Sequence, residues 1–514
     1  MTEAVALDLR VHAARDPQRL AVACGERRVS FADLEALANR LADLLRGLGL
    51  QRGDHLATLL GNGVEPLALG WAAWRSGTVL TPMSTSLVGP ELAYLVRDSD
   101  ARVVIADHAH AAQAATLPAA CPGVTWLSLG GPIEGFRPLE PLLAQASPLP
   151  AVDEPPGGFM LYTSGTTGAP KGVWRPLPPP DFRGTPPWVL DIVSLYGLQG
   201  TGVRYLSPAP QYHAAPLRFS MAALAGGASV VVMPRFDAAE ALRQLQDEGI
   251  THSQWVPAMF QRLLALPESQ RAAFRAPAHR MAIHAAAPCP QAVKRRMIDW
   301  WGPILLEYYA GSEGIGTTLI DSQDWLRHPG SVGRAVRGQL HIAGDGGIEL
   351  PPGATGLVCF SGMPPFEYHK APEKTAARRT PQGWQTLGDI GHVDADGYLY
   401  LTDRLDDMII SGGVNLYPQE IEDALRDAPG VADCAVVGMP DDRFGETPVA
   451  FVVPLPGAAD DEPAWRAALD AHAHRRLGRF KRPSTIHVVD ELPRTPTGKL
   501  LRRQLRERLR ATTR

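Results

Sequence analysis

Residues 161–173 combine the side chains and the spacing that a phosphate-binding loop needs. Leu161-Tyr162-Thr163 is expected to be a strand, and it leads into a run of glycines and hydroxyl side chains that ends near Lys171. Glycines let backbone N–H groups approach a phosphate closely, hydroxyls donate further hydrogen bonds, and the lysine adds a positive charge. The spacing is not that of the GxxxxGK[ST] loop. A plain surface turn is the alternative, and the length of the run disfavours it.

Five further segments bring charged or aromatic side chains into turns rich in glycine or proline. They are Pro210-Gln211-Tyr212-His213 and the runs YYAGSEG (308–314), WQTLGD (384–389), DRLDDMI (403–409) and PRTPTGK (493–499). Taken in order with residues 161–173, they resemble the signature segments of the adenylate-forming superfamily. That superfamily includes acyl-CoA synthetases, peptide-synthetase adenylation domains and luciferases. The resemblance covers roughly residues 29–503, and six segments in register make coincidence implausible.

The resemblance implies an α/β fold with two domains. A large multi-subdomain N-terminal α/β domain, residues 1–404, would bind ATP and the acid. A small mobile α+β domain, residues 405–514, would carry the hinge and the catalytic lysine. Mg²⁺ would be held by Thr163 and Glu313. The residues expected to bind ATP or AMP are Thr163, Ser164, Gly165, Thr166, Thr167, Gly168, Lys171, Ala286, Tyr309, Ser312, Asp389 and Arg404. The family usually has threonine where this chain has Ser312, but the hydroxyl is kept.

The residue types support this chemistry in their own right. Transfer of an adenylyl group to a carboxylate brings two anions together, so catalysis is mainly charge neutralisation and alignment. Glu313 suits Mg²⁺, Asp389 can accept hydrogen bonds from both ribose hydroxyls, and Arg404 offers a planar fork of donors. Tyr309 can stack on adenine. Taken singly, each has an ordinary alternative: a solvated carboxylate, a turn cap, a surface ion pair or a core tyrosine.

Lys499 is the strongest candidate for the catalytic lysine. It follows Pro, Thr and Gly residues in a loop, and a loop lysine can be delivered to a site by domain movement. There it would bridge the carboxylate and the α-phosphate as charge builds. The alternative is that Lys499 merely starts a basic helix, Leu500–Arg510, whose arginines form a solvated face.

The second half-reaction depends on a hinge and an acceptor. By resemblance, Asp406 is the hinge residue, and Ser411, Gly412 and Gly413 admit the pantetheine arm of CoA, although two glycines also favour a simple turn. The segment around them resembles free-standing acyl-CoA ligases. No carrier segment follows residue 514, which argues against a fused peptide-synthetase module.

The acyl pocket is expected to hold a bulky apolar or aromatic acid, because its predicted lining is small and uncharged. By resemblance, that lining includes Tyr212, His213, Ala285, Ala310, Gly311 and Gly314. His213 would gate the pocket or orient the carboxylate, and an ordinary polar wall residue is the alternative.

The preferred function is therefore an ATP-dependent acid–CoA ligase that uses ATP, Mg²⁺ and CoA. The closest rival shares the first step but passes the acyl group to an amine. A luciferase-like oxidation is remote. A non-catalytic nucleotide-binding protein is disfavoured, because a pure binder needs no charge at the reacting phosphate.

The elements that must position these residues alternate between helical and strand patterns. Residues 29–49 are expected to form an amphipathic helix that begins at Ser30. Apolar runs at 55–60, 103–106 and 229–233 are typical of strands buried on both faces of a parallel sheet. Residues 175–188 hold six prolines and are expected to be a loop. Near the C-terminus, a helix opened by Pro418 and strands at 434–437 and 450–453 predict a small α+β domain with two or three strands.

Composition and charge limit which binding partners and cellular locations are expected. A net charge of −4 gives no reason to expect nucleic acid, and five scattered cysteines predict neither a disulfide framework nor a zinc site. The start of the chain does not resemble a signal peptide, and the apolar run 219–234 is too short to span a bilayer. The expected partner is a small carboxylic acid, and the expected location is the cytoplasm. A homodimer is one option for the oligomeric state.

Overall fold

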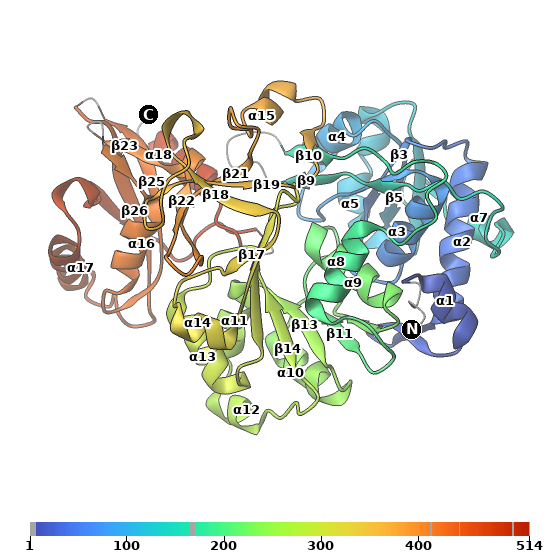
Figure 1. The fold of residues 1–514 in the computed structure, drawn as a ribbon, viewed down its shortest axis with the longest axis horizontal. Coiled ribbons are helices and arrows are strands. Elements are labelled where there is room, and N and C mark those ends of the chain that lie inside the picture. The colour runs from blue at the N-terminus through green and yellow to red at the C-terminus, as the bar shows by residue number, and fades with distance from the viewer. Residues whose placement is uncertain (1–6, 164–169, 412–413, 442, 496–497, 513–514) are drawn as a thin grey trace. The chain divides into compact units, whose positions relative to one another are not determined.

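The computed structural model describes residues 7–163, 170–411, 414–441, 443–495 and 498–512 (Figure 1). The chain forms two compact units. Unit 1 comprises the described residues of 1–163, 170–306 and 366–375, and unit 2 those of 307–365 and 376–514. No helix in the described part of the chain is both long and apolar enough to cross a membrane.

One sheet of unit 1 is entirely parallel. Its strands are β3 (His55–Leu59), β4 (Val79–Pro82), β5 (Ala101–Asp107), β6 (Thr125–Leu129), β7 (Arg137–Pro138) and β8 (Gly158–Phe159), in the order β7-β6-β5-β3-β4-β8. Helix α3 (Glu65–Ser76) packs against β4, and α4 (Gly89–Asp98) packs against β5. All five residues of β3 are buried, as expected for a strand covered on both faces. The strands predicted at 55–60 and 103–106 are confirmed.

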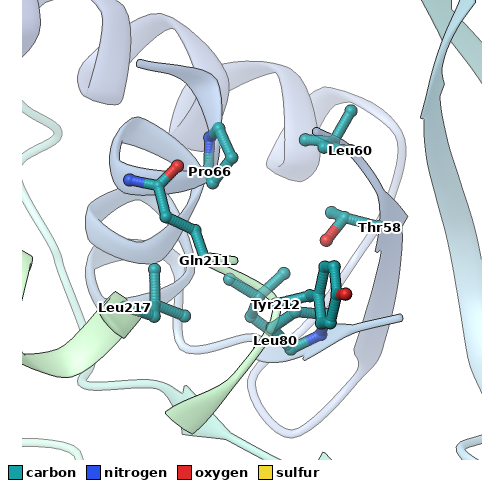
Figure 2. Close-up of a pocket in the computed structure, with 8 residues that line it drawn as sticks. Thr58, Leu60, Pro66, Leu80, Gln211, Tyr212 and Leu217 are labelled. Atoms are coloured by element: carbon teal, nitrogen blue, oxygen red, sulfur yellow. The ribbon is translucent and has the colours of Figure 1, made fainter. Parts of the chain in front are cut away.

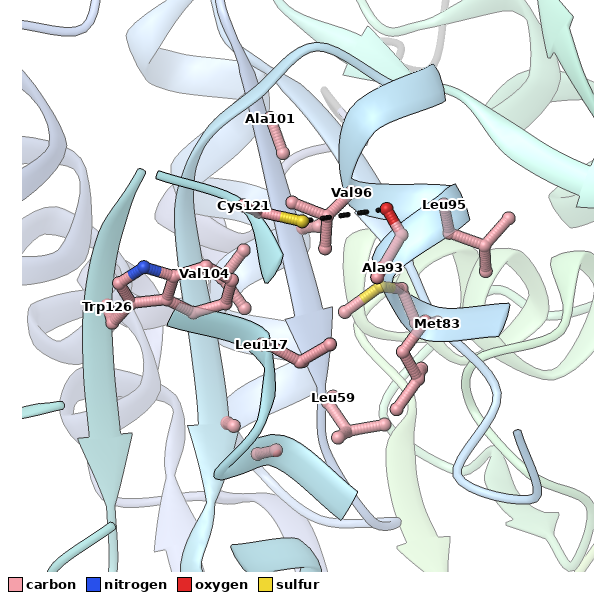
Figure 3. Packing of buried hydrophobic residues seen from close by; sticks show 14 of the residues in the cluster. Leu59, Met83, Ala93, Leu95, Val96, Ala101, Val104, Leu117, Cys121 and Trp126 are labelled. Atoms are coloured by element: carbon pink, nitrogen blue, oxygen red, sulfur yellow. Dashed lines mark hydrogen bonds between the residues drawn. The ribbon is translucent and has the colours of Figure 1, made fainter. Parts of the chain in front are cut away.

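Apolar side chains from these elements form one continuous core (Figure 3). Three of these side chains come from the sheet, namely Leu59 of β3, Val104 of β5 and Trp126 of β6, and Leu95 comes from α4. The Cys121 thiol donates a hydrogen bond to the Ala93 carbonyl at 3.6 Å, so this polar group is satisfied inside the core.

A second set of parallel strands in unit 1 lies in the order β14-β13-β11-β12-β1, with β2 (Arg27–Ser30) antiparallel at its edge. These parallel strands are β1 (Leu20–Cys24), β11 (Arg204–Ser207), β12 (Ser229–Val232), β13 (His252–Trp255) and β14 (Met281–His284). Helix α9 (Ala214–Ala225) precedes β12 (Ser229–Val232) with two glycines between them, and the strand predicted at 229–233 is confirmed. Helix α2 (Phe31–Gly47) begins as predicted, because the Ser30 hydroxyl accepts a hydrogen bond from the Asp33 N–H at 3.1 Å.

A small antiparallel sheet in unit 1 carries the ends of the glycine-rich segment. Strand β9 (Leu161–Thr163) pairs with β10 (Lys171–Trp174), which also pairs with β20 (Glu367–Tyr368). The irregular stretch predicted at 175–188 ends earlier than expected, because α8 (Pro187–Tyr196) begins at Pro187. Proline suits this first helical position, since the N–H that it lacks would have no partner there.

Unit 2 contains an antiparallel sheet of β18 (Gln339–Ala343), β19 (Gly356–Ser361), β21 (Gln385–Val393) and β22 (Leu399–Arg404). Strand β16 (Thr317–Asp321) also pairs antiparallel with β17 (Arg334–Arg337). The domain boundary expected between residues 404 and 405 lies where β22 ends and the short helix η3 (Leu405–Asp407) begins, and it stays a prediction.

The last hundred residues form a mixed sheet with three helices. Five strands take part: β23 (Ile409–Ser411), β24 (Val414–Leu416), β25 (Val431–Asp441), β26 (Gly445–Pro454) and β27 (Thr485–Val488). The helices are α16 (Pro418–Arg426), α17 (Glu462–Arg476) and α18 (Arg502–Thr512). The sheet has more strands than the two or three expected, because β23, β24 and β27 are only three or four residues long, too short for a residue pattern to mark them.

Candidate active site

Three residues of unit 2 form a linked polar group around the Asp389 carboxylate. Asp389 in β21 and Arg404 in β22 are direct partners across the strand pair. The Tyr309 hydroxyl donates a hydrogen bond to Asp389 Oδ2 at 2.6 Å, and Arg404 Nε lies 3.1 Å from Asp389 Oδ1. Asp389 is only 5% exposed, so both of its oxygens are held in fixed directions inside the unit.

Burial and charge set the protonation of this group. Burial, together with the negative charge of Asp389, raises the pKa of Tyr309 well above its ordinary value, so the hydroxyl stays a donor. Burial alone would lower the pKa of Arg404, but the negative charge of Asp389 outweighs it and the pKa is raised. The guanidinium therefore keeps its positive charge at every physiological pH.

Glu313 lies in the turn after Tyr309 and is 8% exposed. A Cβ at Gly311 would lie 2.7 Å from Glu313 Oε2 and 2.6 Å from Leu387 Cδ2, so only glycine leaves this carboxylate its space. A buried carboxylate fits the requirement of Mg²⁺, which binds one or two protein carboxylates and takes its other ligands from phosphates and water. The neighbouring Ala310, Ser312 and Gly314 belong to the same turn of unit 2.

Lys499 is held in a tight turn by its own neighbours. Its N–H donates to Thr495 Oγ1 at 3.0 Å, and the Thr495 N–H donates to the Lys499 carbonyl at 2.8 Å. Arg494 donates to the Gly498 carbonyl at 2.8 Å and pairs with Asp433 of β25 at 2.6 Å. The lysine backbone is therefore anchored to the sheet rather than carried on a free tail.

The structure brings Lys499 into the electrostatic field of the other candidate residues of unit 2. Burial lowers the pKa of its ammonium to about 8, and the positive charge of Arg404 acts in the same direction. The carboxylates of Asp389, Asp407 and Glu313 oppose this shift. A lysine with a lowered pKa, beside buried carboxylates and an arginine, is a physical sign of a functional site.

Sequence reasoning missed an ion-pair network at the predicted hinge. Asp407, in η3, is 2% exposed and lies 3.3 Å from both Arg502 and Arg506 of α18. Arg502 also pairs with the buried Glu422 at 2.6 Å. The expectation that the arginines of this last helix form a solvated face is wrong for Arg502 and Arg506. The spacing of these two arginines, four residues apart and hence on one helical face, was the available signal.

Several predicted residues lie outside the described part of the chain. These are Ser164, Gly165, Thr166, Thr167, Gly168, Gly412 and Gly413. The side chain of Asp406 is also outside it, although its backbone lies in η3. Ser411 is described, and it is the buried last residue of β23.

In unit 1, Thr163 and Lys171 face each other across the β9–β10 pair. Lys171 is the first residue of a strand, and its Nζ lies 5.1 Å from the centre of the Tyr368 ring. Ala285 is buried, and Ala286 has a φ of +79°, an uncommon angle for a residue with a side chain. Such backbone strain concentrates at functional sites and costs about 1–3 kcal/mol.

His213 and Tyr212 lie at the start of α9. His213 is the N-cap residue, and its Nε2 is buried without a hydrogen-bond partner among the described residues. Burial lowers its pKa to about 4, so the ring is neutral at pH 7. Tyr212 lines a small pocket with Thr58, Leu60 and Leu217 (Figure 2). Its volume of about 10 Å³ has room for about one water molecule, so this pocket is not an acyl site.

The predicted acyl-pocket residues divide between the units. Tyr212, His213 and Ala285 belong to unit 1, and Ala310, Gly311 and Gly314 belong to unit 2. The acyl pocket therefore stays a prediction.

Comparison with known proteins gives consistent matches along almost the whole chain. Residues 9–366 match the model of the AMP-binding enzyme family, and residues 420–499 match that of the AMP-binding enzyme C-terminal domain. The long-chain-fatty-acid–CoA ligase FadD13 of Mycobacterium tuberculosis is 36% identical over 499 residues, covering 94% of each chain. The indoleacetate–CoA ligase of Aromatoleum aromaticum is 33% identical, covering 96% of each.

Solved structures agree with the sequence matches. The amide bond synthetase McbA from Marinactinospora thermotolerans superposes with a TM-score of 0.81 at 26% identity, covering 95% of this chain and 96% of that one. The chain therefore belongs to the AMP-binding enzyme family, in the acyl-CoA synthetase branch of the adenylate-forming superfamily.

Proposed function

We propose that this chain is an AMP-forming carboxylic acid–CoA ligase in which the polar group of unit 2 carries out the adenylation step. The acid and ATP give acyl-AMP and pyrophosphate, and CoA then gives acyl-CoA and AMP. The observation that supports this proposal most directly is the placement of four predicted site residues in one compact unit. The charges of Arg404, Asp389 and Glu313 all act on the ammonium of Lys499. The substrates are ATP, CoA and the acid, with Mg²⁺ as the cofactor.

In the first half-reaction, a carboxylate oxygen of the acid forms a bond to the α-phosphorus while the bond to pyrophosphate breaks. Two anions must approach, so the main barrier is electrostatic. The Lys499 ammonium would bridge the carboxylate and the α-phosphate. Glu313, with Thr163, would hold Mg²⁺, which neutralises phosphate charge. Asp389 would accept hydrogen bonds from ribose hydroxyls, because Tyr309 and Arg404 occupy only one site on each of its oxygens.

The loop of residues 164–168 with Lys171 would bind the phosphates, and Ala286, Tyr309 and Ser312 would surround the adenine end of the nucleotide. His213 would contact the acid as a neutral donor or acceptor, since its lowered pKa removes the charged form. These assignments extend the roles that the family resemblance implies.

In the second half-reaction, the CoA thiol attacks the acyl carbon and AMP leaves. Residues 405–514 would rotate about Asp406 between the two steps, and Ser411, Gly412 and Gly413 would then admit the pantetheine arm. The Asp407–Arg502 pairing supports this proposal, because it ties the residue next to the hinge to α18.

The acid would have an apolar or aromatic body. Two observations support this: the predicted pocket residues are small, and the names of two relatives specify a long-chain fatty acid and indoleacetate. A cytoplasmic location fits the use of ATP and CoA, and all five cysteines are free thiols. A homodimer and the absence of a nucleic-acid partner stay predictions.

An amide ligase is the second candidate, because McbA is a structural neighbour. The acceptor can be decided directly. The enzyme is incubated with ATP and an acid, together with CoA in one reaction and a panel of amines in another, and the products are identified by mass spectrometry. Acyl-CoA as the main product supports the proposal, and amide formation without acyl-CoA refutes it.

The role of Lys499 is tested by separating the half-reactions. We expect Lys499→Ala to lower acid-dependent ATP–pyrophosphate exchange by at least about 100-fold, a typical loss for a group that stabilises transition-state charge. Thioester formation from supplied acyl-AMP should persist. Lys481→Ala is the matched control, since Lys481 pairs with Glu420 on the surface of the same unit. Normal exchange in Lys499→Ala would refute the assignment.

A further inference from the structure

Arg218 is an isolated charge in an apolar part of unit 1. It is the only charged residue between Ala214 and Met233, a stretch that forms α9, a turn and β12. Its neighbours Leu217 and Phe219 are fully or almost fully buried. The Nε of Arg218 is itself buried and has no hydrogen-bond partner in the described part of the chain.

A second arginine increases the positive charge at this position. Arg175 directly follows the last residue of β10, and its charge acts on Arg218. Burial together with this charge lowers the pKa of Arg218 to about 10, and burial also lowers the pKa of Arg175. Both groups still carry a positive charge at pH 7. Arg218 has no carboxylate partner among the described residues, and a buried positive charge without one costs free energy, so the position of Arg218 needs an explanation.

The start of α9 adds hydrogen-bond donors and no acid. Its first turn contains no acidic residue, and His213 makes no capping hydrogen bond with its side chain. The first N–H groups of a helix carry a partial positive charge. Around Arg218, therefore, unit 1 offers two guanidinium groups and a helix N-terminus with no acidic residue in its first turn.

Strand geometry separates this positive charge from the proposed phosphate site. Lys171 begins β10 and Arg175 directly follows its last residue, so the two lie at opposite ends of the strand, four residues apart. Four extended residues span about 13 Å. The backbone thus separates Arg175 from Lys171, and we take the anion that Arg218 and Arg175 attract to be distinct from the phosphate that Lys171 would bind.

We propose that Arg218, assisted by Arg175, binds a second anionic group of the acid substrate, a carboxylate or sulfonate at the end remote from the carboxyl that is activated. This inference rests on the proposed ligase function and narrows its substrate class to acids with an apolar body and two anionic ends. A guanidinium presents a planar fork that matches a carboxylate with two parallel hydrogen bonds. Such a ligand would supply the negatively charged partner that Arg218 lacks among the described residues.

The test uses matched acids that differ only at the remote end. ATP–pyrophosphate exchange is measured with straight-chain dicarboxylic acids against monocarboxylic acids of equal carbon number, and with arylalkanoic acids with and without a ring carboxylate. In the unmodified enzyme, kcat/KM should be at least about tenfold higher for the dianionic member of the preferred pair. Arg218→Met should lower kcat/KM for that member by about 10- to 100-fold, the range for a lost charge-assisted hydrogen bond, and so reverse the ratio.

Two further variants sharpen the comparison. Arg218→Lys keeps the charge but loses the fork, so it should retain part of the preference, and it keeps the test available if Arg218→Met does not fold. Arg243→Met is the control, because Arg243 is an exposed residue of α10 (Ala238–Asp247) and pairs with Glu240. It should leave the ratio unchanged. A thermal shift gives a second readout: the preferred diacid alone should raise the Tm of the unmodified enzyme and of Arg243→Met, but not that of Arg218→Met.

The outcomes separate the two proposals. A preference for monocarboxylic acids that Arg218→Met does not change overturns this inference and leaves the ligase function standing. An increase in the KM for CoA in Arg218→Met, without a change in acid preference, also overturns it, because the anion would then belong to CoA. If no acid in either panel supports exchange while a diacid still raises the Tm through Arg218, the ligase function fails and the anion site stands.

Discussion

At the scale of single residues, the protonation state of Lys499 controls the proposed adenylation step. Burial and the charge of Arg404 lower its pKa to about 8, so the free enzyme loses the ammonium as the pH rises through about 8. We expect kcat/KM for ATP–pyrophosphate exchange to fall about tenfold for each pH unit above that value, because kcat/KM reports ionisation of the free enzyme. The measurement is a pH profile from 6 to 10.

Lys499→Arg is the control for this profile. A guanidinium stays charged throughout the range, so the variant should be slower but should show no fall near pH 8. A flat profile in the unmodified enzyme, or the same fall in Lys499→Arg, would contradict the assignment. The rate of thioester formation from supplied acyl-AMP should not follow this ionisation.

The sequence predicted which residues would gather but not their environment. The motifs placed Tyr309, Asp389, Arg404 and Lys499 in one site, and the structure places these four in one unit. It could not show that Lys499 is buried, because burial depends on residues far away in the chain. Arg218 was missed for a related reason: the sequence shows a lone arginine in an apolar helix, but not that its Nε is buried without a hydrogen-bond partner among the described residues.

At the scale of elements, η3 and α18 determine how the C-terminal residues are held. The Met408 N–H donates to the Arg404 carbonyl at 3.1 Å, which closes the short helix around Asp406. Proline at 406 would fix φ near −65° and resist a second backbone conformation. We expect Asp406→Pro to slow thioester formation from acyl-AMP by at least about tenfold and to change ATP–pyrophosphate exchange much less. The two half-reactions are measured separately.

Asp406→Ala is the matched variant, since it removes the side chain and leaves the backbone free to change. It should keep both half-reactions close to those of the unmodified enzyme. An equal loss of both half-reactions in Asp406→Pro would argue against a hinge at this residue and in favour of a general disturbance of the Asp407–Arg502 pair.

Element positions followed from apolar patterns, while element ends did not. The helix start at Ser30 and the strands β3, β5 and β12 agree with the residue patterns, because burial on one or two faces leaves a clear mark in sequence. Strand β25 is seven residues longer than the predicted 434–437, three at its start and four at its end, because its partner β26 supplies backbone hydrogen bonds through polar residues. Such pairing is a property of two segments, and neither one reveals it alone.

At the scale of the whole molecule, buried histidines link folding to pH. His55, His252, His279 and His284 are each at most 8% exposed, and all four belong to unit 1. Burial lowers the pKa of His55 and His252 to about 4 and that of His279 to about 3, and it lowers the pKa of His284 well below its ordinary value. The folded chain therefore keeps these rings neutral where the unfolded chain protonates them.

The sign of the resulting pH dependence follows from proton binding. Between about pH 6.5 and pH 4 the unfolded state binds more protons at these residues, so the free energy of unfolding falls as the pH falls, by up to about 1.4 kcal/mol per pH unit for each histidine. The total is several kcal/mol between pH 7.5 and 5.5, which for a chain of this size lowers the Tm by roughly 5 °C. His213, with a pKa of about 4, and His12, whose pKa burial also lowers, act in the same direction, so His279→Gln removes one of six such groups and should lessen that fall by about a sixth in thermal unfolding experiments. If the Tm stays constant over this range, or if the variant follows the unmodified enzyme at every pH, the histidines are not the groups that bind protons on unfolding.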